Sequence, residues 1–264
     1  MLLRKVGGAV FTKRKLKLSM KCKKLIFLAL SICGIFLSCV SKEDTPILSN
    51  DSFEDSGKYM CGSLPYRMKS IAKNETSKPI LVMYLHGGSS KGNDNETQIK
   101  EAAVDIIYKY LLNNSIYSIF VVPQCPSTDS WGAKMNGTLV KLVEEYEASC
   151  SDVFVLGGSM GGTGTWSLAN SYPEKFRGVM PVAGKPGTAR AVNFKSMRVC
   201  TVMSEADEVM KTAYNEVKSF CDEINAAGGN SFCNIIPASQ QWTHQMTCEK
   251  SYTNECLRFL FLGL

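Results

Sequence analysis

One stretch, residues 152–162, constrains the fold of this chain more than any other. Residues 153–156 (Val-Phe-Val-Leu) are a short apolar run of strand-forming residues, and the residues after position 162 can continue as a helix. Between them, Gly157, Ser159 and Gly161 spell the pattern G-x-S-x-G. Glycine accepts conformations and close approaches that other residues cannot, which suits an abrupt passage from strand to helix. We therefore predict a buried strand, a sharp turn that exposes the hydroxyl of Ser159, and a helix.

This order of strand, serine and helix is that of a nucleophile elbow. The start of the helix would supply backbone N–H groups and the positive end of a helix dipole, which stabilise an oxyanion. The alternative is a turn rich in glycine and serine without any chemistry, because G-x-S-x-G also occurs by chance. A nucleophile needs partners elsewhere in the chain: an oxyanion loop before Ser159, and an acid and a histidine after it.

The chain contains two histidines, His86 and His244. His244 is the only one that follows Ser159, and it lies in a polar loop between the last predicted strand and the terminal helix. As a general base it would take the proton of Ser159 and later return it to the leaving group. The alternative is a surface histidine without a catalytic role.

The acid should follow the predicted strand at residues 197–203. Three carboxylates lie there: Glu205, Asp207 and Glu208. We predict that Asp207 orients the imidazole of His244, because it opens the next helix. Glu205 and Glu208 remain alternatives, and either could simply be a charge at a helix N-terminus.

The oxyanion loop is predicted at His86-Gly87-Gly88-Ser89, directly after the apolar strand at residues 79–85. This is an HGG-type sequence, in which backbone N–H groups meet the developing negative charge. We predict the amides of Gly88 and Met160 as the donors, and a structural role for His86. The alternative for the two glycines is an ordinary turn.

Apolar runs and helical spacings alternate along the rest of the chain. They predict a mostly parallel sheet covered by helices on both faces, in one domain over residues 58–264. The predicted strands are residues 66–71, 79–85, 118–122, 153–156, 176–182, 197–203 and 232–237, with a hairpin-like turn at 73–77. The predicted helices are residues 97–111, 138–148, 163–171, 208–227 and 248–261.

Residues 1–38 are predicted to be an export signal. Lysines precede an apolar run at residues 25–36, which is too short to span a bilayer, and Leu37-Ser38-Cys39 resembles a bacterial lipoprotein cleavage site. Met20 is the expected start, because a signal begins a few residues before its charges. Cys39 would carry the lipid, residues 39–57 would be a polar tether, and the protein would be exported and anchored to a bacterial membrane, facing the periplasm or the cell surface. The alternative is a plain cleaved signal or a membrane anchor.

Charge and cysteine content indicate which partners, crosslinks and metal sites to expect. The nine Lys and Arg residues of the predicted signal leave 21 basic against 24 acidic residues, a net charge of −3, so we expect no nucleic-acid partner. Eight cysteines follow Cys39; their even number permits disulfides, although Cys200 in its apolar run could equally be a buried thiol. Without a C-x-x-C pair or a His/Cys cluster, we expect no metal site.

Four stretches together resemble the α/β-hydrolase superfamily. Within it they are similar to the esterase branch related to polyhydroxybutyrate depolymerases, feruloyl and acetylxylan esterases and "predicted peptidases", and the resemblance spans roughly residues 60–262. The stretches are residues 85–88 with 92–96, residues 122–126 with Trp131, residues 157–166 with 172–176, and the loops of Asp207 and His244. Two departures are Ser204-Glu205, where the branch has His-Gly, and Thr243 and Met246 around the histidine, where it often has Gly and Trp.

The resemblance implies an α/β-hydrolase fold, no cofactor and no metal, and a two-step acyl transfer by Ser159, His244 and Asp207. It also implies an ester substrate, small or polysaccharide, such as feruloylated or acetylated xylan, with Trp131 and Trp242 as candidate substrate contacts. The alternatives are a peptidase or lipase on the same triad, or a silent fold that binds a glycan or partner. The intact triad disfavours the silent fold. The acyl group, oligomeric state and disulfide pairing stay open.

Overall fold

The computed structural model describes residues 51–72 and 76–261. The predicted signal, Cys39 and the first part of the predicted tether lie outside these residues. Among the residues described, no helix is long and apolar enough to cross a membrane.

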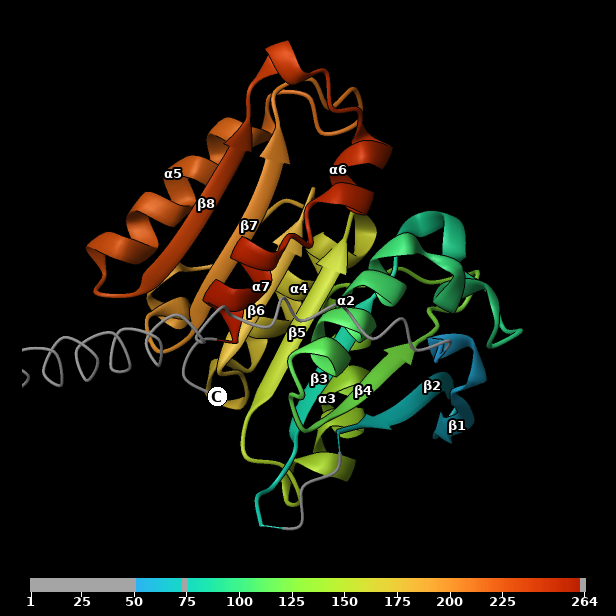
Figure 1. Ribbon diagram of the computed structural model, residues 1–264. Coiled ribbons are helices and arrows are strands. Elements are labelled where there is room, and N and C mark those ends of the chain that lie inside the picture. Colours follow the sequence, from blue (N-terminus) through green and yellow to red (C-terminus); the bar gives the residue numbers. More distant parts are fainter. Residues whose placement is uncertain (1–50, 73–75, 262–264) are drawn as a thin grey trace, which may run out of the picture. The chain divides into compact units, whose positions relative to one another are not determined.

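One sheet organises the structure (Figure 1). In the described chain it has eight strands in the order β1-β2-β4-β3-β5-β6-β7-β8. The second strand pairs antiparallel with its neighbours β1 and β4, and all pairs from β4 through β8 are parallel. The strands are β1 (Gly57–Cys61), β2 (Leu64–Ile71), β3 (Ile80–Leu85), β4 (Ser118–Pro123), β5 (Val153–Gly158), β6 (Gly178–Val182), β7 (Arg198–Ser204) and β8 (Asn230–Ile236).

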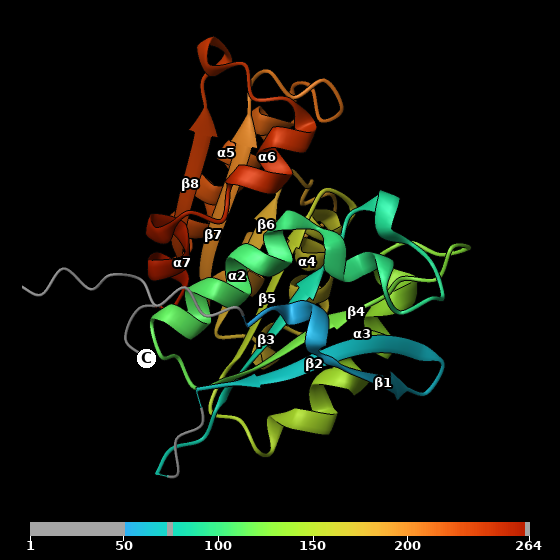
Figure 2. The ribbon, with the colours of Figure 1, turned by 45° about the vertical axis from the view of Figure 1, so that its right-hand side comes forward.

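Helices cover both faces of the sheet (Figures 1 and 2). On one face lie α2, α6 and α7, and on the other lie α3, α4 and α5. The helices are α2 (Ala102–Asn113), α3 (Ala133–Glu147), α4 (Met160–Ser171), α5 (Ala213–Ala226), α6 (His244–Lys250) and α7 (Asn254–Leu260). Short 3₁₀ helices are η1 (Phe53–Asp55), η2 (Gly88–Ser90), η3 (Thr97–Lys100), η4 (Pro173–Lys175), η5 (Ala191–Phe194) and η6 (Ala238–Gln240).

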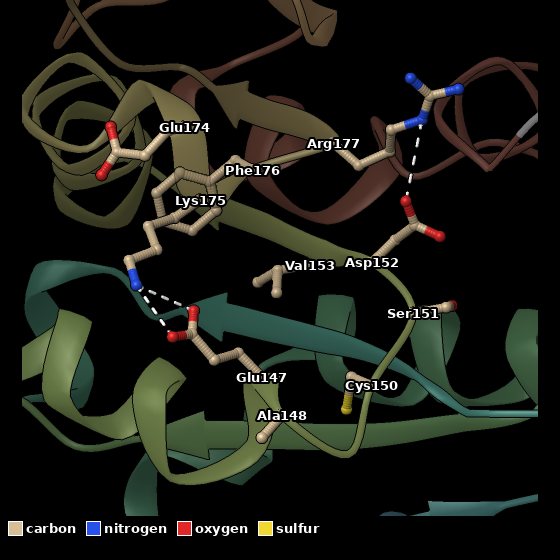
Figure 3. Close-up of a pocket in the computed structure, with 10 residues that line it drawn as sticks. All are labelled: Glu147, Ala148, Cys150, Ser151, Asp152, Val153, Glu174, Lys175, Phe176 and Arg177. Carbon is tan, nitrogen blue, oxygen red and sulfur yellow. Dashed lines mark hydrogen bonds and ion pairs between the residues drawn. The ribbon is translucent and has the colours of Figure 1, made fainter.

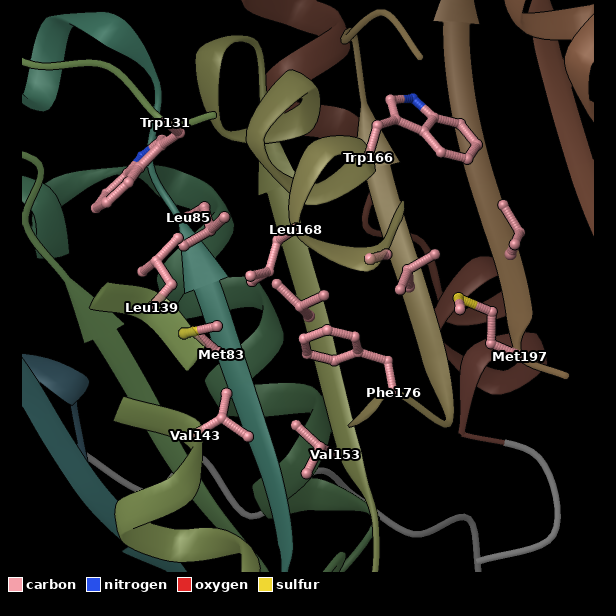
Figure 4. Packing of buried hydrophobic residues seen from close by; sticks show 14 of the residues in the cluster. Met83, Leu85, Trp131, Leu139, Val143, Val153, Trp166, Leu168, Phe176 and Met197 are labelled. Carbon is pink, nitrogen blue, oxygen red and sulfur yellow. The ribbon is translucent and has the colours of Figure 1, made fainter. Parts of the chain in front are cut away.

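Two hydrophobic cores follow from this layering, one on each face. All six residues of β3 are buried, and alternate side chains enter different cores. Leu81, Met83 and Leu85 pack with α3, α4 and α5, in the core that Figure 4 shows, whereas Val82 and Tyr84 pack with α2 and α7. Because β3 is covered on both sides, its sequence is continuously apolar rather than alternating, as expected for a central parallel strand.

The predicted strands and the layered architecture are confirmed, but several boundaries differ. A hairpin-like turn was predicted at residues 73–77, but the strands before and after it, β2 and β3, do not pair, because β4 lies between them. The predicted helix at residues 208–227 begins only at Ala213, since the preceding residues turn around Asp207. The terminal helix is divided into α6 and α7, and the second begins with Thr253 as its N-cap.

The chain joins the domain earlier than predicted. Residues 51–57 were assigned to the tether, yet Phe53 is buried and its ring contacts those of Tyr108 and Phe120. The buried guanidinium of Arg67 donates to the carbonyl oxygens of Glu54 and Ser56. The strand β1, which the sequence analysis did not predict, follows immediately.

The glycines of the elbow permit contacts that a side chain would block. A Cβ atom on Gly161 would lie 1.8 Å from the carbonyl oxygen of Leu85, and one on Gly157 would lie 2.4 Å from the carbonyl oxygen of Gly161. These neighbours are backbone atoms of β3 and α4, which cannot move aside. The strand β3 and the helix α4 can therefore approach this closely only because these positions are occupied by glycine.

We expect Gly161→Ala to lower the free energy of unfolding by about 3 kcal/mol or more, because the added methyl group meets backbone. Gly137 in α3 is the matched control, since it is exposed and a Cβ atom there would meet nothing within 4 Å. Gly137→Ala should raise the free energy of unfolding by about 0.5–1 kcal/mol through helix propensity. Urea denaturation of both variants measures the difference; equal effects would contradict the role assigned to Gly161.

Candidate active site

The candidate site lies at the carboxyl ends of the parallel strands. Ser159 stands between β5 and α4, with backbone angles φ 57° and ψ −115°, outside the regions that a residue with a side chain ordinarily occupies. Its amide donates to the carbonyl oxygen of Val182 and its carbonyl accepts from the amide of Thr163. These bonds hold the strained turn, which is the elbow predicted from the sequence.

The structure brings Ser159, His244 and Asp207 together. The Nε2 atom of His244 lies 2.7 Å from the Oγ atom of Ser159, and its Nδ1 atom lies 2.8 Å from the Oδ2 atom of Asp207. The aspartate side chain is inaccessible to solvent, whereas 15% of the histidine side chain is exposed. The arrangement is that of a serine aligned with a base that a buried carboxylate orients.

The three carboxylates of the acid loop have different partners. Asp207 binds the imidazole through Oδ2, and its Oδ1 atom accepts from the amides of Val209 and Met210. Glu208 accepts from the backbone amide of His244, at the start of α6. Glu205 accepts from the amide of Ala238 in η6. Of the three, only Asp207 touches the imidazole, which distinguishes it from the alternatives that the sequence left open.

His244 is the first residue of α6 rather than a loop residue. Its neighbour Thr243 caps this helix through a hydrogen bond from the amide of Met246 to its Oγ1 atom. Together with the bond from the His244 amide to Glu208, the cap fixes the backbone from which the imidazole projects.

The loop after β3 approaches the serine closely. A Cβ atom on Gly87 would lie 3.8 Å from the Cβ atom of Ser159. The amide of Gly87 itself is occupied, because it donates to the carboxylate of Glu101 at 2.8 Å. The amides of Gly88, at the start of η2, and Met160, at the start of α4, have no acceptor within the described residues. These are the two donors that the sequence predicted for an oxyanion.

His86 supports this loop from within the protein. It is fully buried, and its Nε2 atom accepts from the amide of Cys125 while its Nδ1 atom donates to the carbonyl oxygen of Gly87. Burial lowers the pKa of His86 to about 4, so its imidazole is neutral at physiological pH. This geometry is the structural role expected for His86.

A cavity of about 690 Å³ opens beside the serine. Its walls come from β3, the loop after it, the start of α2, and α6. Its lining residues include Tyr84, Gly88, Glu101, Ser159, His244 and Cys248. Cys248 does not compete as a nucleophile, because burial raises the pKa of its thiol to about 12 and the thiolate is the reactive form.

Neither predicted tryptophan contact lines this cavity. Trp131 is buried in the core (Figure 4), and its indole N–H donates to the carbonyl oxygen of His86. It therefore supports the oxyanion loop from the protein interior and does not contact the cavity. Trp242 is half-buried, lies under the ammonium group of Lys250, and accepts a hydrogen bond at its carbonyl from Ser204. The family resemblance suggested Trp131, and proximity in sequence to His244 suggested Trp242, but neither residue lines the cavity.

Sequence reasoning missed Glu101 and Tyr84. Glu101 fell inside the helix predicted at residues 97–111, and Tyr84 fell inside a buried strand, where an aromatic residue is ordinarily core. The hydrogen bond from the Tyr84 hydroxyl to Glu101, at 2.8 Å, joins two segments whose proximity no local pattern reveals.

A second cavity lies at the opposite ends of the strands (Figure 3). It has a volume of about 520 Å³ and is lined by the residues that precede β5 and β6. Four of its charged groups form two pairs: Lys175 with Glu147 at 2.9 Å, and Arg177 with Asp152 at 3.9 Å. Neither histidine lies in its walls, so it offers no serine–histidine pair.

The described chain also shows no group of three or more His, Cys, Asp or Glu side chains that could hold a metal ion. All eight cysteines from Cys61 to Cys256 are free thiols in this structure.

The sheet order, its antiparallel second strand and the serine on the turn after β5 define an α/β-hydrolase fold. No protein-family model matches the chain, and no curated protein matches it in sequence.

Solved structures with this fold do match. A thermostable esterase is 19% identical with a TM-score of 0.66; the match covers 79% of this chain and 63% of that protein. Est1E from Butyrivibrio proteoclasticus is 15% identical with a TM-score of 0.56, covering 77% of this chain and 98% of Est1E, which has also been solved with ferulic acid bound. An acylaminoacyl peptidase is 13% identical with a TM-score of 0.55, covering 76% of this chain and 40% of the peptidase. At these identities the likeness establishes the fold.

Proposed function

We propose that this protein is a serine hydrolase that cleaves carboxylic esters through an acyl-enzyme. The observation that carries the proposal is the alignment of Ser159, His244 and Asp207 by hydrogen bonds of 2.7 and 2.8 Å at the wall of an open cavity. A protein that only binds its ligand would not need a serine, a histidine and an aspartate joined by hydrogen bonds in this order.

The proposed chemistry uses these groups in turn. His244 removes the proton of Ser159 as the hydroxyl oxygen attacks the ester carbonyl, and the amides of Gly88 and Met160 donate to the oxyanion that forms. Asp207 accepts from Nδ1 and stabilises the imidazolium. The alcohol leaves with the proton from His244, and water activated by the same imidazole then releases the acid.

We propose an acylated carbohydrate, of feruloyl or acetyl ester type, as the substrate class. Exposed polar side chains line the cavity, among them Ser89, Lys100 and Gln245, and these can hydrogen-bond a hydroxyl-rich alcohol. Ferulic acid bound to Est1E, which shares the fold, supports an aromatic acyl group. Lipidation at Cys39 and export to a bacterial membrane, proposed from the sequence, would place the enzyme where polymeric carbohydrate is accessible.

A panel of substrates tests the proposal. The chain from Ser41 onward is assayed with p-nitrophenyl acetate, methyl ferulate, acetylated xylan and an acylated peptide, and a fluorophosphonate probe is located by mass spectrometry. We expect ester hydrolysis and labelling at Ser159, with little cleavage of the peptide. Preferential peptide cleavage would instead identify a peptidase, the activity named for one of the proteins that share the fold. Absence of both turnover and labelling would contradict a hydrolase.

A further inference from the structure

A carboxylate with no place in the triad lies behind the oxyanion loop. Glu101 separates η3 from α2, with backbone angles φ −67° and ψ 132°, which are extended rather than helical. This break divides the helix that the sequence predicted and turns the side chain toward β3. Glu101 also lines the cavity that contains Ser159.

Three donors converge on this carboxylate. Its Oε1 atom accepts from the amide of Gly87 at 2.8 Å and from the hydroxyl of Ser90 at 2.6 Å. Its Oε2 atom accepts from the hydroxyl of Tyr84 at 2.8 Å. Tyr84 belongs to β3, whereas Gly87 and Ser90 are the residues on either side of the turn that holds Gly88. One side chain therefore ties both ends of the oxyanion loop to the strand that it follows.

Burial disfavours the charged form of the Glu101 carboxylate, so hydrogen bonds are needed to keep it in this place. Burial raises the pKa of Glu101, although the hydrogen bonds from Ser90, Tyr84 and Gly87 act in the opposite direction. A negative charge near the oxyanion position does not favour the transition state directly. What the carboxylate supplies is geometry: by binding the Gly87 amide, it sets the peptide plane from which the next amide, that of Gly88, is directed.

We propose that Glu101 is a positioning residue for the oxyanion hole, acting through the loop at residues 87–90 and not on the substrate itself. The proposal rests on the proposed function, because it assigns a role within the same reaction. It requires the hydrogen-bonding shape of the side chain and does not require its charge.

Two substitutions separate shape from charge. In Glu101→Gln the amide oxygen can still accept from Gly87 and Ser90, and the amide N–H can donate to the Tyr84 oxygen. In Glu101→Ala all three donors lose their acceptor. We expect kcat for p-nitrophenyl acetate to fall about 100-fold in Glu101→Ala, with KM changed less than about 3-fold, and to stay within about 10-fold of the wild type in Glu101→Gln.

Asp105→Ala is the matched control. Asp105 lies one turn further along α2, is about half exposed, and pairs with Lys109 at 2.7 Å. Its substitution removes the same charge only four residues further along the chain, without touching the loop. Its kcat should equal that of the wild type, and melting curves of all variants report whether each is folded.

A boronic acid inhibitor supplies a readout that a general structural effect would not move. It forms a tetrahedral adduct with the serine, so its affinity should fall in Glu101→Ala by the same factor as kcat. Hydrogen exchange of the Gly87 amide, which needs no turnover, should accelerate in this variant and not in Asp105→Ala.

The possible outcomes are distinct. An active wild type, with kcat in Glu101→Ala reduced less than 3-fold or reduced without any loss of boronic acid affinity, would overturn the positioning role. If the wild type hydrolyses no ester, the proposed function fails. The exchange rate of Gly87 then decides alone whether Glu101 holds the loop, and an unchanged rate rejects that contact as well.

Discussion

Replacement of Ser159 by alanine is expected to lower kcat for ester hydrolysis by about 10⁶-fold, which corresponds to about 8 kcal/mol of activation free energy. The reason is the loss of the only group that forms a covalent bond to the acyl carbon in the proposed reaction. The remaining imidazole could still activate water, and the amides of Gly88 and Met160 would still polarise a bound carbonyl, so a residual rate above that of the uncatalysed reaction is expected.

The control for this variant is Ser151→Ala. Ser151 is exposed and lies before β5, at the other end of the strand that leads to Ser159, in the wall of the second cavity. Single-turnover release of p-nitrophenol and fluorophosphonate labelling measure both variants. Labelling that persists in Ser159→Ala, or an equal loss of turnover in Ser151→Ala, would show that the nucleophile is another group.

Asp207→Asn should lower kcat by about 10⁴-fold while leaving the fold intact. The two oxygens of Asp207 are not equivalent. The Oδ1 atom accepts from two backbone amides, so the asparagine oxygen will take that position. The asparagine NH₂ group then faces Nδ1 of His244, and Nδ1 must become an acceptor. The ring proton moves to Nε2, where it points at the Ser159 hydroxyl and prevents the imidazole from acting as a base.

Glu205→Gln is the matched control, because Glu205 lies in the same loop and its carboxylate accepts from the amide of Ala238, not from the imidazole. Its kcat should remain within about 3-fold of the wild type. Melting temperatures of both variants should stay close to that of the wild type, since the backbone contacts of Oδ1 are preserved. A rate for Asp207→Asn comparable with that of Glu205→Gln would show that the carboxylate does not orient the base.

Local patterns were sufficient to predict much of this site. A strand, a serine flanked by glycines and a helix are contiguous in sequence, and their geometry follows from the small space that the structure leaves at Gly157 and Gly161. Gly87 and Gly88 could be predicted as the oxyanion loop in the same way, because they directly follow the apolar strand in sequence. The imidazole partner was predicted because the chain has only one histidine after the serine.

Contacts between distant segments account for what was missed. The break at Glu101 is made by donors from β3 and η2, which a helical pattern at residues 97–111 does not encode. The resemblance to the esterase branch suggested Trp131 as a substrate contact, yet its indole N–H donates to the buried carbonyl oxygen of His86. The roles of the three acids Glu205, Asp207 and Glu208 likewise depended on where α6 and η6 pack.

The position of His244 on α6 has a consequence for folding. Four different strands precede the groups of the site: the oxyanion loop, the serine, the aspartate and the histidine. The histidine comes last in sequence, at the start of the second-to-last helix of the described chain. Contacts this far apart in sequence form late, because the entropy of closing long loops must be overcome first. A chain that has emerged only as far as β8 carries the serine on its elbow but no base beside it. In the proposed reaction, hydrolysis therefore begins only when synthesis and docking of the C-terminal region are complete, and a partly made chain would leave esters uncleaved.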